Sequence, residues 1–468
     1  MSKAGSKIHF VGIGGVGMGS LAIALSEAGY QVTGSDGKLY EPMKSQLEKA
    51  QIKLLEGYSS DSCKSLKPDW VVIGNVIRKE NPEAQAWILA GVPFCSFPEA
   101  VRRFVIGDKT SIVCSGTHGK TTTTAWVSFL LRQLEKKPSY LIGGVPADLE
   151  SGSCIADGEY FVGEGDEYDS AFFDKGPKFL HYHPTVAIIA NIEFDHADIY
   201  RDLAHVKQSF EKLAALLPGD GVLVVNYQDP HAMEVAQKAL CPVQTFGIAE
   251  GAMWRFNAIK ETENGFQFQI SYKGRNLGEF QTPLFGVHNL MNLLSGIVAV
   301  SNLGVSMDAI RPIVTQYRGV KRRQQILQMD PFIVIDDFAH HPTEVRATLS
   351  AVKRRFPQRK IWAVFEPRSA TARRSIHQEE YLRSFEDADE ALLSQPFKSA
   401  ELSETERLST GMLSKELTAR GKRAREFSNT DGILDVLKKE VKKGDIVVVM
   451  SNGEFDKIQS KILKVSAQ

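Results

Sequence analysis

Short β-branched runs alternate with amphipathic stretches throughout residues 7–107. Strands are predicted at Ile8–Val11, Gln31–Gly34, Trp70–Gly74 and near Val92–Cys95, and helices at Met18–Ala28, Met43–Ala50 and Pro82–Ala90. Strands that alternate with helices favour a parallel sheet with right-handed crossovers. The pattern therefore predicts a Rossmann-like α/β domain over residues 1–107.

The same alternation restarts near Asp108 and predicts a second α/β unit over residues 108–318. Its strands are predicted at Thr110–Cys114, Tyr160–Val162, Val186–Ala190 and Val222–Asn226, and its helices at about Thr121–Gln133 and Asn289–Leu303. Within this unit Asn264-Gly265 separates two alternating segments, Phe256–Lys260 and Phe266–Tyr272, which is typical of a β-hairpin.

A polar, cationic stretch at Arg318–Gln325 is the predicted hinge to a third unit, residues 319–468. Its strands are predicted at Ile333–Ile335, Ile361–Phe365, Ala391–Ser394 and Ile446–Met450, and its helices at Pro342–Phe356, Asp431–Val441 and Asp456–Val465. This unit is again a Rossmann-like α/β domain. At roughly 150 residues per domain, 468 residues agree with three domains.

The composition excludes several classes of partner. The chain has 56 Lys or Arg and 56 Asp or Glu, and a zero net charge gives no broad reason to bind nucleic acid or an anionic membrane. Five cysteines without a CxxC pair argue against a disulfide framework and a structural zinc site. No apolar run has the length of a signal peptide or a membrane span. We expect a cytoplasmic enzyme, a monomer or weak oligomer, without nucleic-acid or membrane partners.

The first glycine-rich turn, Gly12-Ile13-Gly14-Gly15-Val16-Gly17, lies between a predicted strand and a predicted helix. In this GxGxxG spacing the glycines permit a tight turn, close approach of a phosphate to the backbone, and close helix–strand packing. Asp36 follows the second strand, where a carboxylate accepts a ribose hydroxyl. We interpret the turn as a nucleotide-phosphate site rather than a packing turn, and the motif leaves open NAD or a UDP compound.

The second turn, Gly116-Thr117-His118-Gly119-Lys120-Thr121, has the same strand–turn–helix context. Its Gly-Lys-Thr end predicts a P-loop, although Cys114 stands where the usual motif has glycine. Backbone N–H groups would hold the phosphates of ATP, Lys120 would reach the β- and γ-oxygens, and Thr121 would bind Mg²⁺. Two phosphate-binding turns indicate an enzyme that binds two different phosphorylated compounds.

Several acidic and polar side chains follow predicted strands, where α/β proteins bind their ligands. Glu164 and Glu167 are alternative carboxylates for Mg²⁺, and His196 is a candidate second ligand or substrate contact. Lys207 is interpreted as part of a solvated helix face rather than as a carbamate. The remaining candidates are Asn289 and Asn292, which would cap a helix or bind nucleotide, Asp337 and His340, which should point into a cleft, and the Arg322-Arg323 pair.

These segments resemble the Mur ligases, ATP-dependent amide-forming enzymes of peptidoglycan synthesis. The resemblance covers essentially the whole chain, in six motifs that occur in the family's order: Gly12–Gly17, Gly116–Thr121, Asn191–His196, His288–Asn292, Arg322–Arg323 and Asp337–Pro342. It implies three domains, with a UDP-sugar in residues 1–107, ATP in the central P-loop domain 108–318, and the amine substrate in residues 319–468. It also implies that a carboxylate is activated as an acyl phosphate and then attacked by an amine.

The resemblance assigns the site residues. ATP would bind Gly116, Thr117, His118, Gly119, Lys120, Thr121, Thr122, Asn289, Asn292, Arg323 and Asp337. UDP-N-acetylmuramate would bind Gly12, Ile13, Gly14, Gly15, Val16, Gly17, Ser35, Asp36, Asn75 and His118. Lys120, Glu164 and His196 would be catalytic, with Thr121 and Glu164 on one Mg²⁺ and His196 on a second.

Further sequence segments narrow the choice of amine substrate. The segments Glu164–Tyr182, Glu366–Thr371 and Ser451–Gly453 look more like the branch that adds the murein tripeptide L-Ala-γ-D-Glu-meso-diaminopimelate, in peptidoglycan recycling, than the L-alanine branch. Arg368, Arg373 and Arg374 are candidates for the peptide carboxylates, because a guanidinium matches a carboxylate bidentately; a solvated basic face is the alternative. Two other classes stay open: a nicotinamide-dependent oxidoreductase and a non-catalytic nucleotide sensor.

Overall fold

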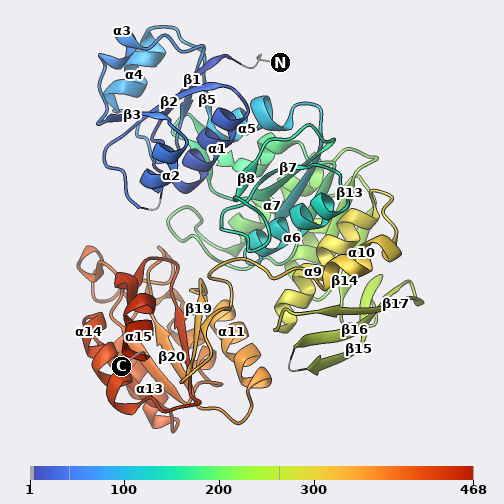
Figure 1. Cartoon of the computed structure of the whole chain (residues 1–468), viewed down its shortest axis with the longest axis vertical. Coiled ribbons are helices and arrows are strands. Elements are labelled where there is room, and N and C mark those ends of the chain that lie inside the picture. The colour runs from blue at the N-terminus through green and yellow to red at the C-terminus, as the bar shows by residue number, and fades with distance from the viewer. Residues whose placement is uncertain (1–4, 42, 263, 467–468) are drawn as a thin grey trace.

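The first sheet lies at one end of the molecule (Figure 1). The computed structural model describes residues 5–41, 43–262 and 264–466. The sheet has the order β3-β2-β1-β4-β5 and is parallel throughout. Its strands are β1 (Lys7–Val11), β2 (Gln31–Asp36), β3 (Lys53–Glu56), β4 (Trp70–Ile73) and β5 (Phe94–Ser96). The helices are α1 (Val16–Glu27), α2 (Met43–Lys49), α3 (Ser62–Ser65), α4 (Pro82–Leu89) and α5 (Phe97–Val101), followed by η1 (Arg102–Ile106).

The second sheet has ten strands in the order β17-β16-β15-β14-β13-β12-β6-β9-β7-β8. They are β6 (Thr110–Ser115), β7 (Ser139–Leu141), β8 (Ser153–Cys154), β9 (Tyr160–Gly165), β12 (Val186–Ile189), β13 (Val222–Asn226), β14 (Val243–Gly247), β15 (Trp254–Thr262), β16 (Gly265–Tyr272) and β17 (Arg275–Thr282). The pairs β9–β6, β6–β12, β12–β13 and β13–β14 are parallel, whereas β15, β16 and β17 form an antiparallel meander. The predicted hairpin is confirmed, except that Gly265 belongs to β16 and pairs with Thr262.

The helices of this unit are α6 (Lys120–Gln133), η2 (Lys178–Tyr182), α7 (Leu203–Leu216), α8 (Pro230–Ala236), α9 (Val287–Ser301) and α10 (Met307–Val314). A separate two-stranded ribbon, β10 (Asp169–Ala171) and β11 (Asp174–Pro177), is antiparallel. The ribbon reaches the first unit, because Phe173 contacts Phe94 edge to face and Ser96 donates a hydrogen bond to Asp174.

The third sheet has the order β18-β19-β23-β20-β21-β22 and is parallel except for β18. Its strands are β18 (Gln325–Gln328), β19 (Ile333–Asp337), β20 (Ile361–Phe365), β21 (Glu390–Ser394), β22 (Arg423–Phe427) and β23 (Ile446–Met450). Its helices are α11 (Pro342–Arg355), α12 (Gln378–Ser384), α13 (Thr410–Ala419), α14 (Thr430–Glu440) and α15 (Ile458–Ser466), with short turns η3 (Ser375–His377), η4 (Ser399–Glu401) and η5 (Phe455–Lys457).

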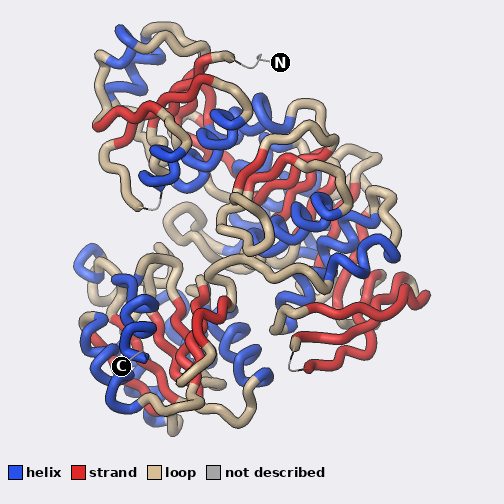
Figure 2. Tube along the Cα trace, viewed as in Figure 1, coloured by secondary structure: helices blue, strands red, loops and turns tan. Residues whose placement is uncertain are grey.

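Each of the three units, here called lobes, combines helices with a sheet (Figure 2). Hydrogen bonds of Ser96 with Asp174 and of Ala197 with Thr371 join the middle lobe to the other two. One apolar cluster runs from Trp126 and Leu290 of the middle lobe to Ile335 and Leu349 of the last. The α/β class predicted from the sequence is confirmed, with parallel pairing in each sheet. Among the described residues, no helix is long and apolar enough to cross a membrane.

Candidate functional site

The first glycine turn connects β1 to α1 and is closed by Asp36. The Gly14 N–H donates to Asp36 Oδ2 at 2.7 Å, and Tyr58 donates to the other carboxylate oxygen at 3.2 Å. Gly12 has φ +85°, a conformation that favours glycine. Buried Ser35 contributes its carbonyl, which accepts from the Gly12 and Ile13 N–H groups. Asp36 therefore shapes the turn as well as lying beside it.

Two cavities adjoin this turn. A cavity of about 600 Å³ is lined by Tyr58, Val76, Ile77, Arg78, Glu80 and Asn81, and predicted Asn75 is exposed just before it. A cavity of about 260 Å³ extends from Val16 and Gly17 to Glu164 and Asp166 of the middle lobe. Glu164, Asp166 and the adjacent Glu167 are called the acidic cluster of the middle lobe. The first glycine turn and this cluster thus border the same cavity.

The second glycine turn connects β6 to α6. Gly116 has φ +132°, and a Cβ there would lie 3.1 Å from backbone atoms of Ala190 and Asn191. Gly119, at φ +83°, is the N-cap of α6, and a Cβ there would lie 2.5 Å from the Asn292 amide oxygen. Both glycines are therefore required by their backbone conformation and by close neighbours.

Lys120 lies inside its own loop. Its ammonium donates to the Gly116 carbonyl at 2.8 Å, to the Thr117 carbonyl at 3.2 Å, and to both oxygens of Glu167 at 3.0 and 3.1 Å. Burial acts to lower the pKa of Lys120, but the carboxylates of Glu167 and Asp166 outweigh it and raise the pKa. Lys120 is therefore a firmly held cation at the start of α6.

Glu164 and Glu167, which the sequence offered as alternatives, have different partners. Glu164 accepts from the Thr121 hydroxyl at 3.1 Å and from the Gly143 N–H. Burial, and next to it the charge of Asp166, raise the pKa of Glu164 to about 7. Glu167 is only 2% exposed and pairs with Lys120 and with His196 Nε2 at 3.0 Å. Only Glu164 lies beside Thr121.

His196 is held on both sides of its ring. Its Nδ1 lies 2.6 Å from the Tyr168 hydroxyl and its Nε2 lies 3.0 Å from Glu167. The predicted residue is thus in the acidic cluster, but both of its nitrogens already have protein partners. Lys207 lies elsewhere, on α7, where it pairs with Glu234.

A cavity of about 540 Å³ lies where the middle and last lobes meet. Of the predicted ATP residues, it is lined by His118, Gly119, Thr122, Asn289, Asn292, Arg323 and Asp337. Residues that the sequence did not single out include Asn226, Gln228, Asp229, His231, Phe246, His288, Gln324, Thr343, Glu344 and Thr348. Their signal was weak, because they are scattered over β13, β14, α8, α9, α11 and the intervening loops and carry no glycine motif.

Two predictions for this cavity need correction. Helix α9 begins at Val287 after Gly286, which makes no side-chain cap, so Asn289 does not cap it. Instead the Asn289 amide donates to the Phe285 carbonyl at 2.9 Å and to Gln324 at 3.1 Å. His340 does not line the cavity with Asp337; it pairs with Glu344 at 3.1 Å.

Asp337 is buried at the end of β19. It accepts from the Gln324 N–H at 2.8 Å, the Ala339 N–H at 2.7 Å and the Thr348 hydroxyl at 3.3 Å. Burial, partly opposed by the Arg323 guanidinium, raises the pKa of Asp337 to about 6. Its donors fix the carboxylate at the rim of the cavity.

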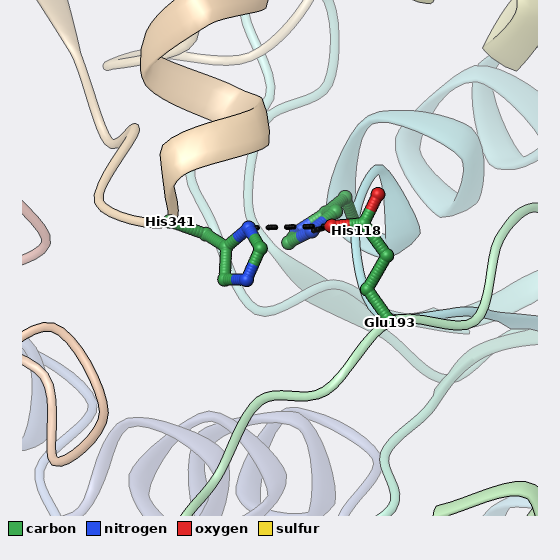
Figure 3. A group of neighbouring side chains, drawn as sticks. All are labelled: His118, Glu193 and His341. Carbon is green, nitrogen blue, oxygen red and sulfur yellow. Dashed lines mark hydrogen bonds and ion pairs between the residues drawn. The ribbon is translucent and has the colours of Figure 1, made fainter. Parts of the chain in front are cut away.

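Three imidazoles and two carboxylates meet beside the P-loop. His118 lies 3.4 Å from Glu193 and 3.2 Å from Glu344, and the Glu193 carboxylate lies 3.4 Å from His341 (Figure 3). His340 lies on the other side of Glu344. Burial opposes a charge on His118, but Glu344 and Glu193 outweigh it and raise the pKa of His118 to about 10. Burial, and next the charge on His118, lower the pKa of His341 to about 3.

The predicted peptide arginines lie near the end of β20. Arg368 stacks on the Phe397 ring at 3.8 Å and lies 3.6 Å from Glu366. Arg373 donates to the Phe397 carbonyl at 3.2 Å and pairs with Glu401 at 3.0 Å. Arg374 immediately precedes η3. None of the three lines the cavities described above.

A P-loop domain between two further domains with parallel sheets defines a class, the three-domain ATP-dependent ligases. The chain belongs to the Mur ligase family and is an ATP-dependent enzyme that forms amide bonds on UDP-N-acetylmuramate substrates. Family models match in succession: "Mur ligase family, catalytic domain" over residues 7–108, "Mur ligase middle domain" over 114–300, and "Mur ligase, glutamate ligase domain" over 322–453. The predicted family is confirmed, and the oxidoreductase and sensor alternatives are excluded.

The names of the relatives specify different amine substrates. The chain is 35% identical over 463 residues to the UDP-N-acetylmuramate–L-alanyl-γ-D-glutamyl-meso-2,6-diaminoheptandioate ligase of Escherichia coli (strain K12), covering 98% of this chain and 97% of that protein. It is 32% identical over 461 residues to the UDP-N-acetylmuramate–L-alanine ligase of Acetivibrio thermocellus, covering 98% and 95%. The crystal structure of a murein peptide ligase from Psychrobacter arcticus 273-4 is 31% identical with a TM-score of 0.72, covering 99% of both chains.

Proposed function

We propose that this Mur ligase joins the carboxylate of UDP-N-acetylmuramate to the amine of the murein tripeptide L-Ala-γ-D-Glu-meso-diaminopimelate, in peptidoglycan recycling. The observation that carries the proposal is the position of the Glu366–Thr371 segment. Thr371 Oγ1 accepts from the Ala197 N–H at 3.1 Å, so this segment abuts the loop that carries His196. An amine substrate held by Arg368 would therefore lie at the edge of the acidic cluster.

The charge of the substrate favours the tripeptide. The tripeptide carries several carboxylates, whereas L-alanine carries one, and guanidinium groups bind carboxylates well. Arg368 is partly exposed and is held by its stacking on Phe397. Arg373 is partly neutralised by Glu401, so Arg368 is the stronger candidate. The L-alanine ligase remains the second candidate, because a relative of that name is 32% identical.

The reaction proceeds through two displacements. A carboxylate oxygen of the muramate attacks the γ-phosphorus of ATP, and ADP leaves, which gives an acyl phosphate. The tripeptide amine then attacks the acyl carbon, loses a proton, and expels inorganic phosphate from the tetrahedral intermediate. Both reacting partners of the first step are anionic, so cationic groups must neutralise the approaching oxygens. Lys120 is placed to do this once ATP phosphates replace Glu167 as its partner.

The donor set beside the P-loop fits Mg²⁺. Thr121 and Glu164 offer the hard oxygen ligands that Mg²⁺ prefers. Burial and the charge of Asp166, only partly offset by Lys120, raise the pKa of Glu164, so a bound cation would stabilise its carboxylate form. When bound there, Mg²⁺ would neutralise the charge on the phosphate oxygens. A second ion at His196 would have to displace Tyr168 or Glu167, which occupy its ring nitrogens.

The two amines can be distinguished by measuring release of phosphate from ATP in the presence of UDP-N-acetylmuramate. We expect the tripeptide to stimulate release and L-alanine to have little effect. The Arg368→Ala variant should raise the KM for the tripeptide by about tenfold, because it loses a charged hydrogen bond worth about 1.4 kcal/mol. Stimulation by L-alanine alone would assign the protein to the biosynthetic branch.

A further inference from the structure

The His118–Glu193–His341 group has the donor atoms and spacing of a transition-metal site. Among the described residues, these three side chains form a group whose ligand atoms all lie within 4.8 Å of one another. The three side chains come from the P-loop, the loop after β12 and the residue before α11, and they converge in Figure 3. No metal is assigned to this group by the proposed function, which uses Thr121 and Glu164.

The distances match tetrahedral coordination. Ligands about 2.0–2.1 Å from a zinc ion in a tetrahedron lie about 3.3 Å from one another. Glu193 Oε2 lies 3.4 Å from His118 Nε2 and 3.4 Å from His341 Nδ1. Two edges of a tetrahedron are therefore already formed, and the ligand atoms of the two imidazoles lie within 4.8 Å of each other.

The surroundings orient the ligands. Glu344 lies 3.2 Å from His118 Nδ1 and accepts the Nδ1–H, while Nε2 faces Glu193 and must release its own proton when an ion binds. A carboxylate on the far nitrogen of a ligating histidine is the usual support in metal sites. The Thr343 hydroxyl donates to Glu193 at 2.6 Å and fixes that carboxylate. The Glu193 side chain is one-third exposed, so an ion can reach the group from the cavity.

We propose that His118, Glu193 and His341 form a binding site for a zinc-class divalent ion, with a fourth position open to the nucleotide cavity. Two imidazoles and one carboxylate favour Zn²⁺ over Mg²⁺, which requires oxygen ligands in octahedral geometry. His118 and Glu193 belong to the middle lobe and His341 to the last, so the bound ion joins the two lobes. The site does not depend on which amine the enzyme uses.

The test uses Co²⁺ as a spectroscopic substitute for Zn²⁺, added to the metal-free full-length protein. We expect one equivalent to give the intense visible bands of tetrahedral Co²⁺, which Zn²⁺ then abolishes. His341→Asn should lose these bands while it keeps the helix cap, because asparagine also accepts from the Thr343 N–H. His118→Gln should lose them as well, whereas the control His231→Ala, which lines the same cavity, should retain them.

Thermal unfolding supplies a second readout. Zn²⁺ should raise the midpoint of the wild-type protein, since the ion joins two lobes, and should not raise that of His341→Asn. The proposal is overturned if wild type shows only the weak bands of octahedral Co²⁺. It is equally overturned if His341→Asn keeps the tetrahedral bands, or if His231→Ala loses them.

Discussion

Single buried carboxylates set the chemistry of the site. Glu167 accepts from Lys120 and keeps its negative charge, since the Lys120 cation, against the effect of burial, lowers its pKa. Burial raises the pKa of Glu164 and of Asp337, and the nearby cations Lys120 and Arg323 offset this only in part. Residues of one chemical type thus differ in the pKa of their carboxyl groups according to their neighbours.

Asp337 makes the free energy of unfolding depend on pH. On folding, the pKa of the Asp337 carboxyl rises from 3.8 to about 6. Below about pH 4 the carboxyl is protonated in both the folded and the unfolded state. Above about pH 6 it is ionised in both, and its buried charge then destabilises the folded state. The free energy of unfolding therefore falls as pH rises from about 4 to about 6, an effect of about 3 kcal/mol at 1.4 kcal/mol per pKa unit. We expect Asp337→Asn to remove this downward slope.

Urea denaturation at several pH values between 4 and 8 checks this prediction. The free energy of unfolding of the wild type, relative to that of Asp337→Asn, should fall as the pH rises from about 4 to about 6 and should then level off. The exposed Asp220→Asn variant is the control, because it should follow the wild-type slope. Parallel curves for wild type and Asp337→Asn would show that the carboxyl does not titrate in this range.

At the scale of elements, the P-loop depends on the backbone of Gly116. Its φ of +132° is strained for any side chain, and a Cβ would lie 3.1 Å from the backbone of Ala190 and Asn191. We expect Gly116→Ala to weaken ATP binding by about 5- to 100-fold, from about 1–3 kcal/mol of strain. Calorimetric titration with ATP measures it. Gly219→Ala is the control, because a Cβ there meets no atom within 4 Å; equal affinities in both variants would refute the prediction.

Elements with strong hydrophobic periodicity were predictable from the sequence. The strands β19 and β23 are buried on both faces and contain the continuous apolar runs Ile333–Ile335 and Ile446–Met450, and β1 and β6 are rich in buried apolar residues. The strand β22 was missed because its sequence, Arg-Ala-Arg-Glu-Phe, is mostly polar. It is stable there because Glu390 of the adjacent strand pairs with Arg423 and Arg425, a partnership that no local pattern reveals.

The residues of the candidate site could likewise be predicted only in part. Lys120, Asn292 and Asp337 belong to compact motifs, so their positions near one cavity could be predicted. The pairing of Glu167 with Lys120 could not, because the two residues are brought together by adjacent parallel strands. The contacts of Glu193 with Thr343 and His341 join different lobes. Such contacts depend on how the lobes pack, which one sequence does not encode in any local pattern.

At the scale of the whole molecule, the lobes are joined at the site itself. Thr343, in the first turn of α11 of the last lobe, donates to the Glu193 carboxylate of the middle lobe at 2.6 Å. Thr371 reaches back to the Ala197 N–H of the middle lobe. The last lobe and the loop that carries His196 are therefore held together by a few polar contacts.

Thr371 is the contact through which this arrangement can be tested. Thr371→Val keeps the volume but leaves the half-buried Ala197 N–H without its acceptor, which costs about 0.5–1.5 kcal/mol. We expect kcat/KM for the amine to fall by about 2- to 10-fold, while the affinity for ATP in the neighbouring cavity stays unchanged. Thr371→Ser keeps the hydroxyl and should retain most activity. Steady-state kinetics with varied amine, together with ATP titrations, separate the two substrates. If Thr371→Val retained full kcat/KM, or if it weakened ATP binding to the same extent, the contact would not serve to align the amine with the activated carboxylate.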